Sequence, residues 1–249
     1  MSGIWRRRQK RSRKKRAMSN ACALNFFHAN LLQRAVSAGI LSLVLASCAV
    51  DNLSGQAAPA APKSEYRKLE REVFAETNKL RANPVAYGTV LEGVLERMSG
   101  GIYYPRNSDI GIKTKEGEKA VKEALAVLGG KSALSNLKWS EELAELARKH
   151  VNDTGPKGLV GHVGSKGEGF SERLSAVFES GKFTFSSENL AYGYSNAEDI
   201  VLQLIIDDGV PGRGHRKNML KVKINYTGIG CGYHREYGHM CAAIYAYRK

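Results

Sequence analysis

The first 47 residues contain no aspartate or glutamate, although ten of the 38 basic residues lie there. The rest of the chain has 28 basic and 24 acidic residues, so only +4 of the formal net charge of +14 belongs to it. A nucleic-acid-binding domain is expected to carry a basic face on its folded part. The charge distribution therefore argues against nucleic acid as a partner.

Residues 1–47, called the leader below, also lack the roughly 20 consecutive apolar residues that a membrane-spanning helix requires. The apolar run of the leader extends only from Ala35 to Ser47 and follows a basic region. This layout is typical of a secretory signal. The signal has ordinary length if translation begins at Met18. The stretch before Met18 is then either a misassigned start or a disordered basic tail.

Cysteines are few, and two of the four lie in or at the end of the leader. Cys22 is expected to leave with the signal. The sequence Leu-Ala-Ser-Cys ending at Cys48 resembles a bacterial lipobox, in which the cysteine is lipidated after cleavage; the alternative is a signal-region cysteine with cleavage elsewhere. An Ala/Pro-rich polar stretch follows and indicates a flexible tether. We therefore predict a signal segment at 1–48, a tether at 49–63 and one folded domain at 64–249.

The other two cysteines, Cys231 and Cys241, flank the turn of a predicted β-hairpin near the C-terminus. In an oxidising compartment the natural interpretation is a disulfide. Two free thiols packed in a core are the alternative. A zinc pair fits less well, because the spacing differs from that of zinc ribbons.

The order of predicted elements favours an α+β class. A proline at 84 separates the first two helices, and Thr114, Ser140 and a Ser195–Glu198 capping box are expected to begin later ones. The expected helices are 64–83, 84–98, 114–130, 141–153, 171–180 and 197–206, with a strand within 181–194 and a hairpin within 226–249.

Two of the six histidines, His162 and His215, stand in glycine-rich segments where the backbone can bend to present a side chain. Together with Glu188 and the pair Asp207 and Asp208, they form a set that can hold a divalent metal or perform acid–base chemistry. The sequence has neither a G-x-S-x-G nucleophile elbow nor an HExxH zinc motif. An activated nucleophile is therefore not indicated.

Longer motifs resemble a known family. The segment "SSENLAYGYSNAEDIVLQLIIDDGVPGRGHRKNML", with "GHVGSKGEG" before it and "TGIGCGYH" after it, is similar to the CAP superfamily, also called SCP domains. This superfamily includes cysteine-rich secretory proteins, venom allergens and plant pathogenesis-related proteins. The blocks "FAETNKLRANP" and "LKWSEELAELARKHVND" extend the resemblance from about Tyr66 to the C-terminus, and the form of the motifs resembles a mainly bacterial branch.

The resemblance implies a three-layer α-β-α sandwich around a cleft lined by two histidines and two acids. Carried over by position, His162, Glu188 and His215 match three members of this set. Asp207 is the expected second acid, with Asp208 as the alternative. Two departures from the family's common pattern stand out. Ser187 occupies the position where glycine usually precedes the glutamate, and Lys166 and Glu168 replace the usual residues of the glycine-rich segment, so that Lys166 adds positive charge beside the site.

Two functions compete on these grounds. One is a secreted or lipid-anchored, non-enzymatic binding module that presents its cleft to a lipid, peptide, glycan or protein outside the cytoplasm. The membrane contact would be made by lipid on Cys48; without lipid, the protein would be secreted or periplasmic. The alternative is a zinc-dependent hydrolase in which His162 and His215 bind the metal and Glu188 acts as general base.

Overall fold

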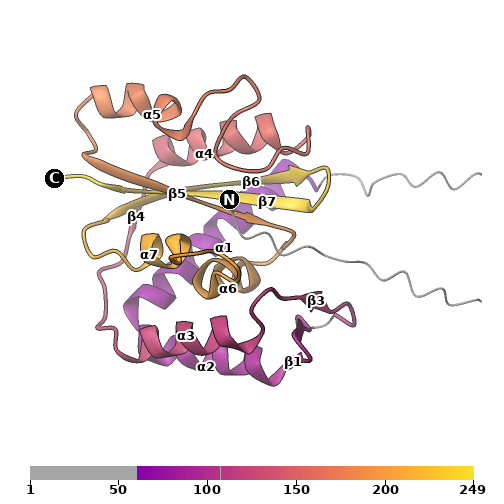
Figure 1. The fold of residues 1–249 in the computed structure, drawn as a ribbon. Helices are drawn as coiled ribbons and strands as arrows, with labels where there is room; N and C mark the ends of the chain where they lie inside the picture. Colours follow the sequence, from indigo (N-terminus) through magenta and orange to yellow (C-terminus); the bar gives the residue numbers. More distant parts are fainter. Residues whose placement is uncertain (1–60, 107) are drawn as a thin grey trace, which may run out of the picture. The chain divides into compact units, whose positions relative to one another are not determined.

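The computed structural model describes residues 61–106 and 108–249, so the predicted signal, the predicted lipidation site Cys48 and most of the predicted tether lie outside the described residues. In the described ranges a four-stranded sheet lies between two layers of helices (Figure 1). None of the helices in these ranges is long and apolar enough to span a membrane. The helices are α1 (Lys63–Ala82), α2 (Pro84–Glu96), α3 (Glu118–Gly129), α4 (Glu141–Thr154), α5 (Phe170–Glu179), α6 (Ala197–Ile206) and α7 (Gly214–Met219).

The main sheet has the order β4-β6-β7-β5, which makes β5 an edge strand. Only the short β4 runs parallel to its neighbour β6. A second, small sheet of two-residue strands lies between α2 and α3. The strands are β1 (Met98–Ser99), β2 (Ile102–Tyr103), β3 (Ile112–Lys113), β4 (Lys138–Trp139), β5 (Phe185–Tyr192), β6 (Tyr226–His234) and β7 (Gly238–Tyr247).

Each face of the main sheet has its own apolar core. On one face α4 and α5 cover a cluster that includes Leu143, Leu174 and Ile244, all at most 1% exposed. On the other face α1 and α6, together with α7, cover a larger cluster that includes Leu80 and Ile205 (Figure 1). The chain is therefore an α+β protein with the predicted α-β-α layering.

Close packing of α4 on the sheet depends on three alternate glycines of β6. A Cβ on Gly228 would lie 2.1 Å from the backbone nitrogen of Ala144, and one on Gly230 would lie 2.3 Å from that of Arg148. Real Cβ atoms do not approach other atoms so closely. Gly228, Gly230 and Gly232 of the segment "TGIGCGYH" thus form a glycine strip without side chains, against which α4 packs directly.

Two expected helix starts are wrong. Helix α3 begins at Glu118 after Gly117, while the hydroxyl of Thr114 donates to the carbonyl of Gly101. Helix α6 is capped by Asn196 rather than Ser195, because Asn196 Oδ1 accepts a hydrogen bond from the backbone nitrogen of Asp199 at 2.9 Å. Ser140 caps α4 as expected, accepting from Leu143 N. The other predicted helices and the hairpin form within a few residues of their expected limits.

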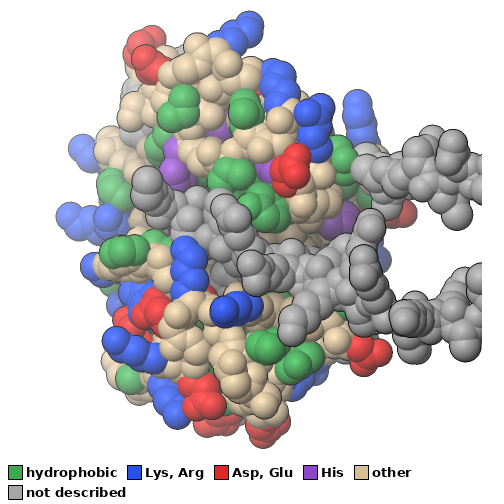
Figure 2. All heavy atoms as spheres, turned by 45° about the vertical axis from the view of Figure 1, so that its right-hand side comes forward, with side chains coloured by type: hydrophobic (Ala, Val, Ile, Leu, Met, Phe, Trp, Pro, Cys, Tyr) green, Lys and Arg blue, Asp and Glu red, His purple; other side chains and the backbone are tan. Residues whose placement is uncertain are grey.

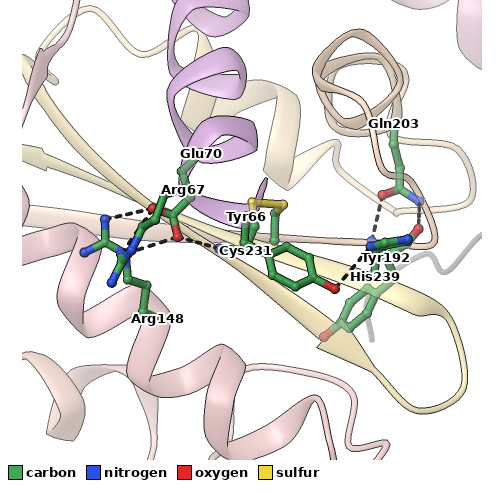
Figure 3. The surroundings of a disulfide bond; sticks show 9 residues. Tyr66, Arg67, Glu70, Arg148, Tyr192, Gln203, Cys231 and His239 are labelled. Atoms are coloured by element: carbon green, nitrogen blue, oxygen red, sulfur yellow. Dashed lines mark hydrogen bonds and ion pairs between the residues drawn. A yellow bond between two sulfur atoms is a disulfide. The ribbon is translucent and has the colours of Figure 1, made fainter. Parts of the chain in front are cut away.

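Polar side chains from the helices pair with backbone groups at both edges of the main sheet. Gln203 of α6 accepts a hydrogen bond from Tyr192 N at 3.0 Å and donates to Tyr192 O at 3.1 Å. On the opposite edge, Glu70 of α1 accepts from Cys231 N at 3.1 Å and forms an ion pair with Arg148 (Figure 3). The nearby disulfide between Cys231 and Cys241 confirms the predicted pairing.

Candidate functional site

The first polar cluster is built around the buried carboxylate of Glu188 on β5, whose side chain is 1% exposed. Arg173 of α5 binds it with two nitrogens, Nη2 at 2.8 Å from Oε1 and Nη1 at 3.1 Å from Oε2. His162 Nδ1 lies 2.8 Å from Oε1. Burial raises the pKa of Glu188, but the hydrogen bonds from His162 and Arg173 and the charge of Arg173 outweigh burial and hold the pKa below its ordinary value. The carboxylate is therefore ionised and fully engaged.

His162 is the member of this cluster that reaches the surface, with a side chain 43% exposed. It belongs to the glycine-rich segment 155–169 that connects α4 to α5, which we call the His162 loop. Three apolar side chains of the same loop are also exposed, Leu159 by 39%, Val160 by 41% and Val163 by 56%. Figure 2 shows histidine side chains next to hydrophobic ones on the described surface.

The His162 loop has no regular secondary structure, yet buried side chains hold it at several points. His234 Nε2 lies 3.1 Å from the carbonyl oxygen of Leu159, and His150 Nε2 lies 3.0 Å from that of Gly161. Arg173 Nη2 donates to the carbonyl of His162 at 3.0 Å. Burial lowers the pKa of both His150 and His234, so both rings are neutral near pH 7. These contacts give the exposed loop a fixed backbone.

The second cluster pairs Asp207 with His215. Asp207 ends α6 in the left-handed conformation, with φ of 57°, which favours glycine or asparagine. Its Oδ1 lies 2.6 Å from His215 Nδ1, and its Oδ2 accepts from His215 N at 2.9 Å. Asp208 instead accepts from the backbone nitrogens of Lys115 and Glu116 at 2.6 and 2.8 Å. Of the two adjacent acids, Asp207 is the partner of His215.

Two arginines, Arg213 and Arg216, hold the backbone around this second cluster. Arg213, also left-handed with φ of 55°, forms ion pairs with Glu116 and Glu123 of the α3 region and donates to the carbonyl of Asp207. Arg216 donates to the carbonyls of Ile205 and Ile206 at 2.7 Å each. Arg216 thus links α7 to the last carbonyls of α6.

The two clusters lie on opposite faces of β5. Glu188 and Asn189 are consecutive in the strand, so their side chains point to opposite faces. Glu188 holds the His162 loop, whereas Asn189 Nδ2 donates to the carbonyl of His215 at 3.0 Å and Asn189 Oδ1 accepts from Asn218. The structure thus brings the four candidates together as two pairs, and a single hollow shared by all four stays a prediction.

Three hollows of the described residues are lined by other residues. One of about 590 Å³ lies between the segment 209–213 and the side chains of Glu116 and Glu123. One of about 320 Å³ shares Glu123, Arg213 and Lys217 with it. A third, of about 370 Å³, lies beside Tyr66 at the start of α1. None of the four predicted site residues lines these three hollows.

A zinc site is not completed by the residues present. In both pairs the histidine Nδ1 faces a carboxylate and leaves Nε2 free, an orientation that zinc-binding histidines share. Zinc, however, takes three or four protein ligands. Among the described residues no group of three His, Cys, Asp or Glu is placed to hold a metal ion, and both oxygens of Glu188 are engaged by Arg173. The donor set therefore does not fit the expected metal.

Sequence reasoning missed Arg173, although it contacts both Glu188 and the carbonyl of His162. A single arginine in a short amphipathic helix is ordinarily a solvated residue, and no local motif marks it. The roles of Arg213 and its partner Glu116 were also missed, because they are 97 residues apart in the chain. The sequence did mark Asn189, because it directly follows Glu188 in the family-like segment that begins "SSENLAYG".

Comparisons with known proteins place this arrangement in a family. An uncharacterized membrane protein of Bacillus subtilis, YlbC, is 30% identical over 122 residues, which cover 48% of this chain and 32% of that protein. The chain thus spans about a third of the length of this relative.

Three solved structures are similar at low sequence identity. An extracellular SCP-domain protein from Bacillus anthracis is 22% identical with a TM-score of 0.37, covering 46% of this chain and 35% of its own. An outer surface protein from Borrelia burgdorferi is 16% identical with a TM-score of 0.39, covering 47% and 80%. A cysteine-rich secretory protein from Staphylococcus aureus is 12% identical with a TM-score of 0.40, covering 75% and 41%. These scores are too low to carry an argument about this chain.

The family itself is shown by its sequence profile. Residues 74–245 match the family described as "CAP: Cysteine-rich secretory protein family". The match covers more than half of the chain and contains both histidine–carboxylate pairs, the edge strand β5 and the hairpin with its disulfide. This protein belongs to the CAP family.

Proposed function

We propose that the protein is an extracytoplasmic, non-enzymatic binding module that presents the His162 loop to a ligand. The observation that carries this proposal is the combination of exposed apolar side chains with a fixed backbone in that loop. Val163, Val160 and Leu159 belong to the same loop as the exposed side chain of His162. A preformed apolar surface with a polar group at its centre is a common form of binding site, because little ordering free energy is lost on association.

The polar clusters favour binding over catalysis. A general base needs a pKa near the working pH and a free lone pair. The pKa of Glu188 lies below its ordinary value, and Arg173 and His162 engage its two oxygens. Asp207 likewise has both oxygens bonded to His215. These carboxylates hold the histidines in place.

The proposed location outside the cytoplasm rests on the leader and on the disulfide. A secretory signal would deliver the domain to an oxidising compartment, where Cys231 and Cys241 form their bridge. Lipid on Cys48, followed by the tether 49–63, would hold the domain at a membrane surface. Mass spectrometry of the mature N-terminus tests this directly. A chain that begins at Cys48 with added acyl mass is expected; an unmodified N-terminus means a freely secreted or periplasmic protein.

Binding is tested with three probes applied to the purified chain: a phage-displayed random dodecapeptide library, a glycan array and anionic phospholipid vesicles. Val163→Asp places a charge in the exposed apolar patch and should weaken binding of the positive probe at least ~10-fold. Val222→Asp is the matched control, because Val222 is 72% exposed but lies outside the His162 loop. Binding that both variants reduce equally, or no binding to any probe, contradicts the proposal.

The zinc-dependent hydrolase is tested by calorimetry with zinc chloride on the wild type and on a variant with both His162→Ala and His215→Ala. We expect no stoichiometric binding at micromolar zinc, since the two imidazoles lack further ligands. Tight one-to-one binding that the double variant loses would instead support the hydrolase.

A further inference from the structure

Two buried histidine rings hold the His162 loop by its backbone carbonyls. His234, the last residue of β6, is 0% exposed, and its Nε2 lies 3.1 Å from the carbonyl oxygen of Leu159. His150 of α4 is 1% exposed, and its Nε2 lies 3.0 Å from the carbonyl oxygen of Gly161. A carbonyl oxygen can only accept a hydrogen bond, so Nε2 carries the proton in both neutral rings. The Nδ1 atom of each ring is therefore an acceptor.

The acceptor of His234 is fully used by the turn between β6 and β7. Its Nδ1 accepts from Glu236 N at 3.2 Å and from Tyr237 N at 3.3 Å. A second proton on the ring would change Nδ1 from an acceptor into a donor that faces two other donors. Both hydrogen bonds would be lost, and a positive charge would lie at a buried position. The charged ring therefore does not fit the place that the neutral ring occupies.

The surroundings of His234 do not compensate for such a charge. The rings of Tyr192 and Tyr237 lie against it, at centroid distances of 5.3 and 5.0 Å. Burial raises the pKa of Tyr192 to about 12, so this side chain stays neutral in acid. Burial lowers the pKa of His234 and outweighs both its hydrogen bond to Leu159 and the charge of Glu236, which act in the opposite direction.

His150 meets the same difficulty in a different way. Its Nδ1 is buried and has no hydrogen-bond partner among the described residues, so a proton there would be a buried donor without an acceptor. Burial is the main cause of its lowered pKa, and the charges of Arg173 and His162 act in the same direction. The charge of Glu188 opposes them, but Arg173 already pairs with this carboxylate.

The turn and the His162 loop are packed as one unit. Arg235 N donates to the carbonyl of Gly155 at 2.9 Å, and a Cβ on Gly158 would lie 3.3 Å from Glu236 Cγ. Displacement of the His234 ring would thus disturb both segments. His162 itself differs, because its Nδ1 faces the carboxylate of Glu188, which can accept from a neutral or a charged ring.

We propose that the His162 loop is a pH-sensitive switch: in acid, protonation of His234 and His150 withdraws both rings from the carbonyls of Leu159 and Gly161 and releases the loop. This inference rests on the proposed function and assigns a regulation to the same surface. Outside the cytoplasm, where we place the domain, the pH of the medium acts on it directly. A ligand bound at the loop would leave as the medium becomes acidic.

The direction of the effect follows from the two states of the loop. In the released loop both rings are solvated and have the ordinary histidine pKa of about 6.5. In the docked loop the pKa of both rings is lower. The docked loop therefore has its full stability above about pH 6.5 and loses it as the pH falls toward the lower values. Each ring shifts the equilibrium at most ~10-fold per pH unit, and both together at most ~100-fold.

The first test follows the loop without any ligand. Methyl NMR signals of Leu159, Val160 and Val163 are recorded between about pH 7.5 and about pH 4.5, on both sides of the ordinary histidine pKa. Below about pH 6.5 these signals should move to the positions of solvated side chains. The methyl signals of Leu128, buried in α3, should stay unchanged over the same range. Loop signals that do not move, or that move only together with those of Leu128, overturn the proposal.

The second test removes the titrating rings. In a chain with His150→Gln and His234→Gln the side-chain amides can still donate to the loop carbonyls but take up no proton, so the loop signals should be independent of pH. Each single variant should have a transition that is less steep than that of the wild type. His239→Gln is the matched control, because His239 is a half-buried histidine of the same hairpin whose ring faces Tyr66. Wild-type transitions in the double variant and in both single variants contradict the switch.

The third test separates the switch from the proposed function. Whichever of the dodecapeptides, glycans or anionic vesicles binds at about pH 7 should bind the wild type at least ~10-fold more weakly at about pH 5, and the double variant equally well at both. If no probe binds, the proposed function fails, while the transition of the free loop can still be observed. A probe that the wild type and the double variant lose alike in acid keeps the binding module and removes the switch.

Discussion

At the scale of single residues, the buried pair of Arg173 and Glu188 is the most sensitive contact of the candidate site. Their side chains are only 9% and 1% exposed, so removing the guanidinium leaves a carboxylate in a poorly solvated position. Arg173→Leu should lower the free energy of unfolding by about 3–5 kcal/mol. Urea denaturation followed by circular dichroism measures this loss.

The control for this prediction removes both charges. A chain with Arg173→Leu and Glu188→Leu has no unpaired buried charge and should regain most of the lost stability, because apolar replacements of buried ion pairs are often neutral. A single Arg173→Leu variant with the wild-type urea midpoint would show that the pair does not hold the His162 loop.

Glu116 gives the protein a specific dependence on pH. Hydrogen bonds from Arg213, opposed by desolvation and helped by the Gly209 N–H, lower the pKa of Glu116 to about 2. In the unfolded chain a glutamate has a pKa of about 4.3. The pKa is lower in the folded state, so Glu116 stabilises the fold above about pH 4.3 and loses this effect as the pH falls toward 2.

The variant Glu116→Gln should therefore be less stable than the wild type at pH 7 and nearly equal to it at pH 2. Urea midpoints at the two values measure the difference. Glu118→Gln serves as control, because Glu118 is half exposed in an ion pair with Lys122 on the surface of α3. A stability gap for Glu116→Gln that is the same at both pH values would refute the role of Arg213.

Sequence alone predicted His162, Glu188, His215 and Asp207 as candidates because each stands in a recognisable motif. It could not predict Arg173, since nothing near this residue distinguishes a buried ion-pairing arginine from a solvated one. It also predicted one hollow shared by all four candidates; the structure shows them as two hydrogen-bonded pairs, and the shared hollow stays a prediction. The arrangement as two pairs depends on the position of β5 at the edge of the sheet. The strand order is determined by contacts between residues that are distant in sequence.

At the scale of elements, the residue that caps the start of α6 is Asn196 and not its neighbour Ser195. The capping box was predicted one residue too early, because serine and asparagine both favour this position and Ser195 stands three residues before a glutamate. Asn196→Ala removes the observed cap and should cost about 1 kcal/mol of stability, whereas Ser195→Ala should change it by less than about 0.5 kcal/mol. Thermal or urea unfolding compares the two, and a larger loss for Ser195→Ala would contradict the observed cap.

The glycine strip of β6 sets the distance between the sheet and α4. Gly230→Ala should destabilise the protein by about 3 kcal/mol or more, because the new Cβ would overlap backbone atoms of Ala147 and Arg148 that cannot rotate away. Gly214→Ala is a matched control, since a Cβ there meets no atom within 4 Å. Urea denaturation measures both, and equal midpoints for the two variants would contradict the close packing.

At the scale of the whole molecule, local pattern predicted the class but not the strand order. Helical periodicity and the C-terminal hairpin depend on neighbours in sequence, and both were found close to their expected limits. The pairing of β5 with β7 joins residues more than 45 positions apart, and the parallel pairing of β4 with β6 joins residues 88 apart, at Lys138 and Tyr226. No local signal specifies such contacts, so the position of β5 at one edge of the sheet became visible only in the structure.

The disulfide between Cys231 and Cys241 is the one covalent cross-link in the described part of the domain. Cys231 and Cys241 stand opposite each other on β6 and β7, ten positions apart, at the point where Glu70 of α1 binds Cys231 N. Closing so short a loop restricts the unfolded chain and contributes roughly 2.7 kcal/mol in the loop-entropy treatment. A chain with Cys231→Ala and Cys241→Ala should lose about that amount.

Reduction of the disulfide in the wild type should cause the same loss of stability and lower the urea midpoint to that of the double variant. Under denaturing conditions a thiol reagent should then detect two additional thiols. The double variant should not respond to the reductant. Because the β6–β7 ladder and its contacts with α1 and α4 remain after reduction, the domain should still fold and keep its affinity for a bound probe at neutral pH. A loss of binding on reduction without loss of folding would instead place the disulfide, rather than the His162 loop, at the ligand.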